Sequence, residues 1–180
     1  MTQEKVLARF LDTLKDFGIE YMVTGSIASI RYGRPRLTHD MDIVLVFKTE
    51  QVEKLLKELG GDFSPDIDTI REMVKSAGMF EIMHSRTGLK IDCWNLTDTE
   101  YEKESFGRRK KLNFAETQAY FSTPEDIILS KLLWQKKGAS EKHLEDIKGI
   151  LEVQVKLDRR YMQKWAEKLG VLEIWENLKK

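Results

Sequence analysis

The chain has 180 residues, in which 30 Lys and Arg balance 30 Asp and Glu, with 41% hydrophobic residues and a mean hydropathy of -0.45. This length predicts one domain with a hydrophobic core, to which a small helical extension can be attached. A net charge of zero disfavours a protein that coats nucleic acid, and no apolar run approaches the roughly 18 residues of a membrane span.

The two halves of the chain carry opposite charge. Residues 1–100 contain 13 basic and 17 acidic side chains, a net charge of -4, and residues 101–180 contain 17 and 13, a net charge of +4. A single cysteine, Cys93, excludes an intramolecular disulfide, and the first ten residues lack the apolar stretch of a signal peptide. We therefore expect a cytoplasmic protein.

Hydrophobic spacing predicts alternating helices and strands over the first hundred residues. The segment 40–47 (DMDIVLVF) is the most apolar and is rich in β-branched residues, so we expect a central strand that is covered on both faces. The predicted elements, in chain order, are a helix over 6–17, a strand over 20–24, a helix over 26–33, the strand over 40–47, helices over 49–59 and 66–78, and strands over 79–85 and 89–95.

After residue 97 the pattern is weaker. A charged stretch at 98–111 precedes two short strands, predicted at 111–114 and 117–122. Thr123 and Pro124 then have the character of an N-cap and a first helical residue, with an acidic residue three positions after the cap. Three or four helices are predicted from there onward.

The fold class that follows is α/β (α+β), with a mixed sheet flanked by helices and a C-terminal helical extension. We place the core in residues 1–97, and a connecting segment and helical region in residues 98–180. No linker composition separates the two parts, so we expect the helical region to pack on the core.

Two carboxylates begin the central strand. Asp40 and Asp42 are two residues apart, so both side chains project from one face. Like charges side by side repel, and they are acceptable when a divalent cation lies between them or when the strand begins in water. A bare Asp-x-Asp leaves both interpretations open.

A Gly-Ser pair ends the strand before them. Gly25 and Ser26 open the following helix, where free backbone amides and the helix dipole favour a phosphate group. Glycine lets the backbone approach a ligand closely, and Ser26 adds a hydroxyl group. A plain turn in which Ser26 is only the N-cap is the alternative.

A third carboxylate, Asp92, lies inside an apolar predicted strand, where an ionised side chain needs a partner. With Asp40 and Asp42 it would complete a set of hard oxygen ligands suited to Mg²⁺ or Mn²⁺ beside a bound nucleoside triphosphate. Trp94 shares the face of Asp92, and either stacking on a base or packing in the core is consistent with that position.

In these residues the chain resembles the nucleotidyltransferase superfamily, which has the polymerase-β-like fold. The shared pattern is a strand ending in Gly25-Ser26, a later strand with Asp40-Met41-Asp42, and Asp92 on a further strand, all within residues 20–95. The segment from 122 to about 153 further resembles the bacterial AbiEii-type toxin nucleotidyltransferases. The resemblance implies transfer of a nucleoside monophosphate from an NTP to an acceptor.

Lys131 and Asp146 fall on the apolar sides of two predicted helices, where each charge needs a partner. A structural ion pair between them is one interpretation, since pairing is usual for buried charges. The resemblance implies a functional role instead, in which Lys131 contacts the nucleotide phosphates and Asp146 helps to complete the site.

Arginines and lysines could also bind anions. Arg31, Arg34 and Arg36 lie between the Gly-Ser turn and Asp40, close enough for at least one to reach phosphate oxygens, and we include Arg36 in the nucleotide site. The basic run 108–111 could guide RNA, although a solvated loop explains such a run as well.

We therefore expect a Mg²⁺-dependent nucleotidyltransferase in which Asp40, Asp42 and Asp92 hold metal and Asp92 also acts as general base. The resemblance leaves the acceptor open among RNA or tRNA, a protein and a small molecule. It also implies a toxin that works with a cognate antitoxin. The alternative is a module of the same fold that binds nucleotide, or an antitoxin-like partner, without catalysis.

Overall fold

The computed structural model of the protein describes residues 2–38, 40–65, 68, 70–72, 76, 78–138 and 140–178. Within this part, seven strands form one mixed sheet in the order β3-β4-β5-β2-β1-β7-β6. The strands are β1 Glu20–Thr24, β2 Asp40–Val46, β3 Phe63–Pro65, β4 Met79–His84, β5 Leu89–Asn95, β6 Lys110–Phe114 and β7 Thr117–Phe121.

Parallel pairing occurs between β2 and β5 and between β1 and β7, and the other neighbours are antiparallel. The strands of the second half of the chain therefore extend the sheet formed by the first half, beside β1. This mixed sheet confirms the predicted fold class.

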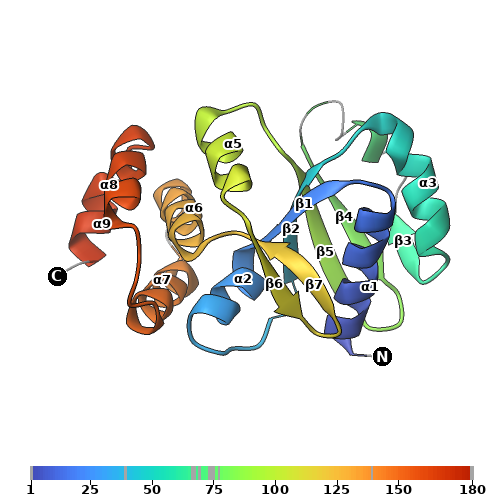
Figure 1. Cartoon of the computed structure of the whole chain (residues 1–180), viewed down its shortest axis with the longest axis horizontal. Helices are drawn as coiled ribbons and strands as arrows, with labels where there is room; N and C mark the ends of the chain where they lie inside the picture. The colour runs from blue at the N-terminus through green and yellow to red at the C-terminus, as the bar shows by residue number, and fades with distance from the viewer. Residues whose placement is uncertain are drawn as a thin grey trace.

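Figure 1 separates two groups of helices, with α2 and α5 between them. α1 and α3 lie together at the right, and the C-terminal helices α6 to α9 lie at the left. The helices are α1 Gln3–Asp16, α2 Gly25–Tyr32, α3 Thr49–Leu59, α5 Glu100–Gly107, α6 Pro124–Lys137, α7 Glu141–Val153, α8 Arg159–Lys168 and α9 Leu172–Leu178. No helix in the described ranges has both the length and the apolar character needed to span a bilayer.

Most predicted elements are confirmed, and two were missed. β3 is a three-residue strand, and α5 forms within the charged stretch that we left unassigned. Of the helix predicted over 66–78, residues 68 and 70–72 are helical, and most of the remainder lies outside the described residues. The helix start at Thr123 is confirmed, because its hydroxyl accepts a hydrogen bond from the Asp126 amide and Pro124 follows it.

One feature of the central strand was predicted wrongly. Met41, Ile43 and Leu45 of β2 are buried in the hydrophobic core, as expected, but Asp42, Val44 and Val46 on the other face are only half-buried. Asp42 and Val44 on that face line a cleft. One face of the strand is therefore apolar because it packs in the core, and the other face combines acidic and apolar residues at a candidate site.

Candidate active site

Gly25 joins β1 to α2 at a point where no side chain fits. Its φ of +58° is in the left-handed region, and a Cβ atom placed on it would overlap the Asp42 carboxylate. The glycine thus lets the N-terminus of α2 approach the acidic strand closely. The Gly25-Ser26 turn and Asp42, separated in the sequence, form one corner of the cleft.

Asp42 and Asp92 are direct neighbours across the parallel pair β2 and β5. Their Cα atoms are about one strand spacing apart, roughly 4.8 Å. Lys90 lies 3.2 Å from Asp92 Oδ2, whereas Asp92 Oδ1 is buried without a hydrogen-bond partner in the described residues. A buried oxygen of this kind, beside a second carboxylate, suits a bound cation.

The electrostatics of Asp42 reflect this crowding. Burial and the neighbouring charge of Asp92 raise the pKa of Asp42. Hydrogen bonds from the Ser26 amide and the Trp94 side chain, and the charge of Lys131, act in the opposite direction on that pKa. Each of these opposing groups stabilises a negative charge at this position.

Asp40 is placed differently from the other two acids. It is the first residue of β2, is exposed, and pairs in register with Lys90. No group of three or more His, Cys, Asp or Glu side chains in the described ranges has metal-binding geometry as it stands. The structure thus brings together Asp42 and Asp92, and the participation of Asp40 stays a prediction.

A chain of polar contacts links the Gly-Ser turn to the C-terminal helices. The Arg36 guanidinium donates to Ser26 Oγ at 2.9 Å and to both carboxylate oxygens of Asp146 at 2.8 Å. Asp146 also pairs with Lys131 Nζ at 2.7 Å. The four residues Ser26, Arg36, Lys131 and Asp146, all predicted to bind nucleotide, are therefore linked by direct contacts, although they come from separate parts of the chain.

Lys131 and Asp146 form the ion pair that we considered as the structural alternative, and both side chains are 7% exposed. Burial lowers the pKa of Lys131, and the pair with Asp146 opposes this effect. Burial alone would raise the pKa of Asp146, but hydrogen bonds from Arg36 and Lys131 hold it below its usual value. Lys131 also lines the cleft, so the ion pair does not remove it from the site.

The other two arginines near the turn have different partners. Arg34 pairs with Glu152 of α7 at 2.5 Å, and Arg31 lies over the Phe121 ring, 5.3 Å from its centroid. Of the three arginines considered from the sequence, Arg36 is therefore the one whose guanidinium contacts a predicted nucleotide-binding residue, Ser26.

The cleft between the sheet and the C-terminal helices has a volume of about 490 Å³. Its floor comes from β1, β2 and β5, and its walls come from α5, α6 and α7. Among the lining side chains are Met22, Thr24, Ser26, Asp42, Val44, Trp94, Glu102, Lys131, Trp134, Lys137, Lys142 and His143. A cleft of this size, with converging polar groups in an apolar lining, suits a nucleotide-sized ligand.

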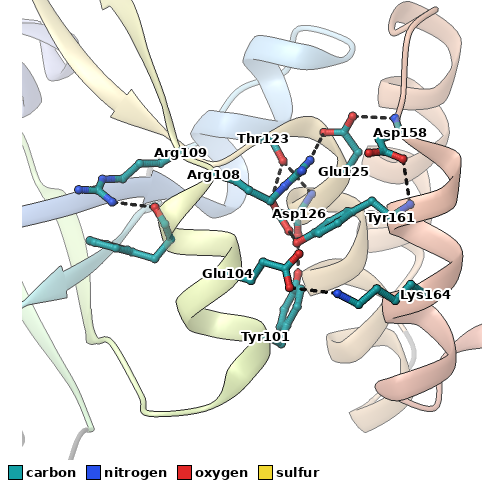
Figure 2. A network of polar contacts seen from close by, with 11 residues as sticks. Tyr101, Glu104, Arg108, Arg109, Thr123, Glu125, Asp126, Asp158, Tyr161 and Lys164 are labelled. Atoms are coloured by element: carbon teal, nitrogen blue, oxygen red, sulfur yellow. Dashed lines mark hydrogen bonds and ion pairs between the residues drawn. The ribbon is translucent and has the colours of Figure 1, made fainter.

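Asp126, also on the wall of the cleft, is a buried hub that sequence reasoning did not find (Figure 2). Tyr161 of α8 donates to its Oδ1 at 2.7 Å, and Thr123 donates to its Oδ2 at 2.6 Å. Arg108 lies 3.3 Å from the same carboxylate and stacks over the Tyr161 ring, 3.8 Å from its centroid. The sequence marks Asp126 only as a helix-start acid, because its main partner is 35 residues away.

A glycine turn and a helix N-terminus thus face two adjacent carboxylates and a buried lysine, an arrangement that suits nucleotidyl transfer. Comparison with known proteins shows that the protein is a nucleotidyltransferase. The chain belongs to the aminoglycoside-2''-adenylyltransferase family, whose model matches residues 6–123, about two thirds of the chain. The match includes the turn and all three predicted acids and ends before Lys131 and Asp146.

Solved structures of similar proteins have the same fold. The structure of ANT(2'')-Ia in complex with adenylyl-2''-tobramycin is 17% identical, with a TM-score of 0.61, covering 94% of this chain and 98% of that one. An antigenic nucleotidyltransferase-like protein from Paracoccidioides brasiliensis is 17% identical, with a TM-score of 0.59 and coverages of 98% and 91%.

A third structure, the lincomycin-bound lincosamide antibiotic adenylyltransferase LnuA, is 17% identical, with a TM-score of 0.56 and coverages of 86% and 99%. None of the curated protein sequences matches this chain. Family membership supports transfer of a nucleoside monophosphate from an NTP, and the resemblance to AbiEii-type toxins stays a prediction.

Proposed function

We propose that the protein transfers the nucleoside monophosphate of an NTP to a hydroxyl group of a small-molecule acceptor and releases pyrophosphate. The observation that carries the proposal is the pairing of Asp42 with Asp92 beside the Gly25-Ser26 turn. Lys131 lines the same cleft as Gly25, Ser26 and Asp42.

The triphosphate binds at the N-terminus of α2 in this proposal. The Ser26 hydroxyl and the amides that follow Ser26 in the first turn of α2 donate to phosphate oxygens, and Lys131 and Arg36 supply positive charge from two sides. Asp146 holds both cations in place through its hydrogen bonds. These groups orient the α-phosphate toward the carboxylates. Such positioning of the reacting groups is the main source of rate enhancement in this proposal.

Asp42 and Asp92 fit a divalent cation, because the buried Oδ1 of Asp92 has no hydrogen-bond partner in the described residues and the two carboxylates are adjacent. Asp40, on the same face of β2, would add a third oxygen donor. When bound, Mg²⁺ would neutralise part of the negative charge on the phosphate oxygens.

The chemical step forms a bond between the acceptor oxygen and the α-phosphorus and breaks the bond from that phosphorus to the oxygen bridging to the β-phosphate. The pyrophosphate leaves with that oxygen. Asp92 accepts the proton of the acceptor hydroxyl, as a general base within hydrogen-bond reach would. The Ser26 and Lys131 groups stabilise the negative charge that develops on the leaving group.

Two of the four residues of the basic run 108–111 are engaged within the protein, which weakens the case for RNA as the acceptor. Arg108 pairs with Asp126 and Glu125, and Arg109 pairs with Glu20 at 2.6 Å, so both are engaged within the protein. Aminoglycosides, from which the family takes its name, are the first acceptors to test, and lincosamides are the second. The toxin role and the antitoxin partner have no comparable support from the structure.

The test is to incubate the protein with each labelled NTP, Mg²⁺ and a panel of acceptors, and to measure pyrophosphate release and the label in small-molecule, RNA and protein fractions. We expect label in the small-molecule fraction and none with Asp42→Ala. The control is Asp98→Asn, which changes an exposed carboxylate outside the cleft. Turnover by Asp42→Ala equal to wild type would contradict the assignment, and NTP binding without pyrophosphate release would favour a non-catalytic module.

A further inference from the structure

The floor of the cleft has two parallel rows of side chains with different chemistry. Thr24, Asp42 and Asp92 are in register across β1, β2 and β5, and so are Met22, Val44 and Trp94. All of these except Asp92 line the cleft, and Asp92 lies beside Asp42 at its edge. The rows are two residues apart along each strand, about 6.7 Å. The first row is polar and carries the candidate catalytic acids, and the second row is apolar and ends in an indole ring.

The wall opposite, formed by α6, repeats this order. Lys131 lines the same cleft as Asp42 of the polar row. Trp134, one helical turn further along, contacts Trp94 of the apolar row, with 6.0 Å between ring centroids and the rings edge to face. Floor and wall therefore both change from charge to aromatic ring in the same direction across the cleft.

Trp134 differs from the other tryptophans of the C-terminal helices in its exposure. Trp165 and Trp175 are 2% and 1% exposed and belong to the core, whereas Trp134 is 45% exposed and lines the cleft. Lys137, an exposed side chain at the end of α6, lies 5.0 Å above its ring. A large aromatic surface in this position is unexplained by packing.

From this arrangement we propose that Trp134 and Trp94 form the binding surface for the nucleobase of the NTP. A nucleotide has the same order as the cleft, with the phosphates at one end and an aromatic ring at the other. With the phosphates at Ser26 and Lys131, the ribose extends over the second row and the base reaches the two indoles. The inference rests on the proposed function, and it adds a preference for purine bases, which offer the larger stacking surface.

The experiment compares ligands with and without a base. Binding of the α,β-methylene analogue of ATP, the matching CTP analogue and inorganic tripolyphosphate, each with Mg²⁺, is measured by calorimetry for wild type, Trp134→Ala and Trp134→Phe. Val155→Ala is the control, since Val155 is an exposed apolar residue outside the cleft. None of these ligands requires turnover, so the readout is independent of activity.

We expect Trp134→Ala to weaken binding of the ATP analogue about five- to hundredfold, and to change tripolyphosphate binding less than about twofold. Trp134→Phe should keep most of the affinity, and wild type should bind the ATP analogue more tightly than the CTP analogue. Unchanged binding of the ATP analogue in Trp134→Ala, equal weakening for both phosphate ligands, or equal affinity of wild type for the two bases would each overturn the inference.

These outcomes separate the inference from the proposed function. Wild type that releases pyrophosphate while Trp134→Ala keeps full affinity for the ATP analogue would overturn the base site alone. Wild type that binds neither nucleotide nor tripolyphosphate and releases no pyrophosphate would overturn both.

Discussion

A side chain at position 25 would overlap the Asp42 carboxylate, so we expect replacement of Gly25 to disturb the candidate active site. In Gly25→Ala the added methyl group would push the Asp42 carboxylate away, besides the strain of a positive φ. We expect nucleotidyl transfer to fall at least about a hundredfold while the fold is retained, a loss of about 3 kcal/mol in transition-state stabilisation. Pyrophosphate release and circular dichroism measure the two effects.

The matched control for this change is Gly18→Ala. Gly18 has nearly the same φ, +61°, but a Cβ there meets nothing within 4 Å. It should therefore lose only the roughly 1 kcal/mol of stability that the backbone conformation costs a non-glycine residue, with full activity. Equal activities for the two variants would mean that contact with Asp42 has no importance.

The two partners of the buried ion pair should respond unequally to removal. Asp146→Ala leaves Lys131 without its anion and removes the partner of Arg36, so we expect the free energy of unfolding to fall by about 3 kcal/mol. Lys131→Met leaves Asp146 paired with Arg36, and we expect a loss of about 1 kcal/mol or less. Urea denaturation measures both.

Activity then separates structure from function at this pair. Lys131→Met should remain folded and yet bind an NTP at least about tenfold more weakly, whereas Lys148→Met, an exposed lysine of α7, should bind normally. If Lys131→Met unfolds as readily as Asp146→Ala and keeps its nucleotide affinity, the pair is structural alone.

At the scale of elements, α5, α6 and α8 are joined at Asp126 (Figure 2). Tyr161→Phe removes the hydroxyl that donates to the buried carboxylate, and we expect a loss of about 2 kcal/mol in unfolding free energy at neutral pH. Tyr32→Phe is the matched control, because the Tyr32 hydroxyl is buried without a hydrogen-bond partner in the described residues. Its removal should cost little or nothing.

The effect of Tyr161→Phe should depend on pH. Burial raises the pKa of Asp126 in the folded protein. At pH values between the pKa of the unfolded chain and this raised pKa, the folded protein keeps a proton that the unfolded chain has lost. The contribution of this carboxyl group to stability therefore falls as pH rises through that range. The Tyr161 hydroxyl favours the charged form, and its loss would raise that pKa further. Urea denaturation should therefore show a larger difference from wild type at about pH 8 than at about pH 4, and an equal difference would contradict this account.

Strong local patterns made much of the fold predictable. β1 and α3 have the predicted bounds, because β1 is a short apolar run between Gly18 and Gly25 and α3 has a clear helical spacing. β3 was not predictable, because three residues with a proline at an edge carry no strand pattern. α5 was missed because its stability depends on the cap at Thr99 and on packing of Tyr101 and Phe106, within an otherwise charged stretch.

The candidate-site residues that could be predicted are those whose reactive or ligand-binding groups belong to a short sequence motif. The Gly-Ser turn, the acidic strand and Asp92 belong to this group. The contact of Arg36 with Asp146 joins residues 110 positions apart, and the facing of Trp134 and Trp94 depends on how α6 docks on the sheet. Such contacts depend on tertiary packing, which spacing along one element does not encode.

At the scale of the molecule, the acidic half and the basic half of the chain both contribute strands to one sheet. β7 pairs with β1 in parallel, and the Ser122 amide donates a hydrogen bond to the Val23 carbonyl at 2.9 Å. One hydrophobic core includes residues from α1 through α9. The -4 and +4 halves therefore meet at the cleft, where Asp42 comes from β2 and the lining lysines come from α6 and α7.

This shared core predicts that the protein unfolds as one cooperative unit and not as two parts divided near residue 97. Hydrogen exchange across a urea series, read by mass spectrometry, should show peptides from β2 and β5 losing protection with the same free energy and urea dependence as peptides from α6 and α8. The reason is that removal of α6 and β7 would expose both the edge of β1 and the core residues Ile127 and Phe121. Earlier loss of protection in α6 and α8, with the strands still protected, would show instead that the C-terminal helices are a separate unit, and that closure of the cleft is an equilibrium that nucleotide binding could shift.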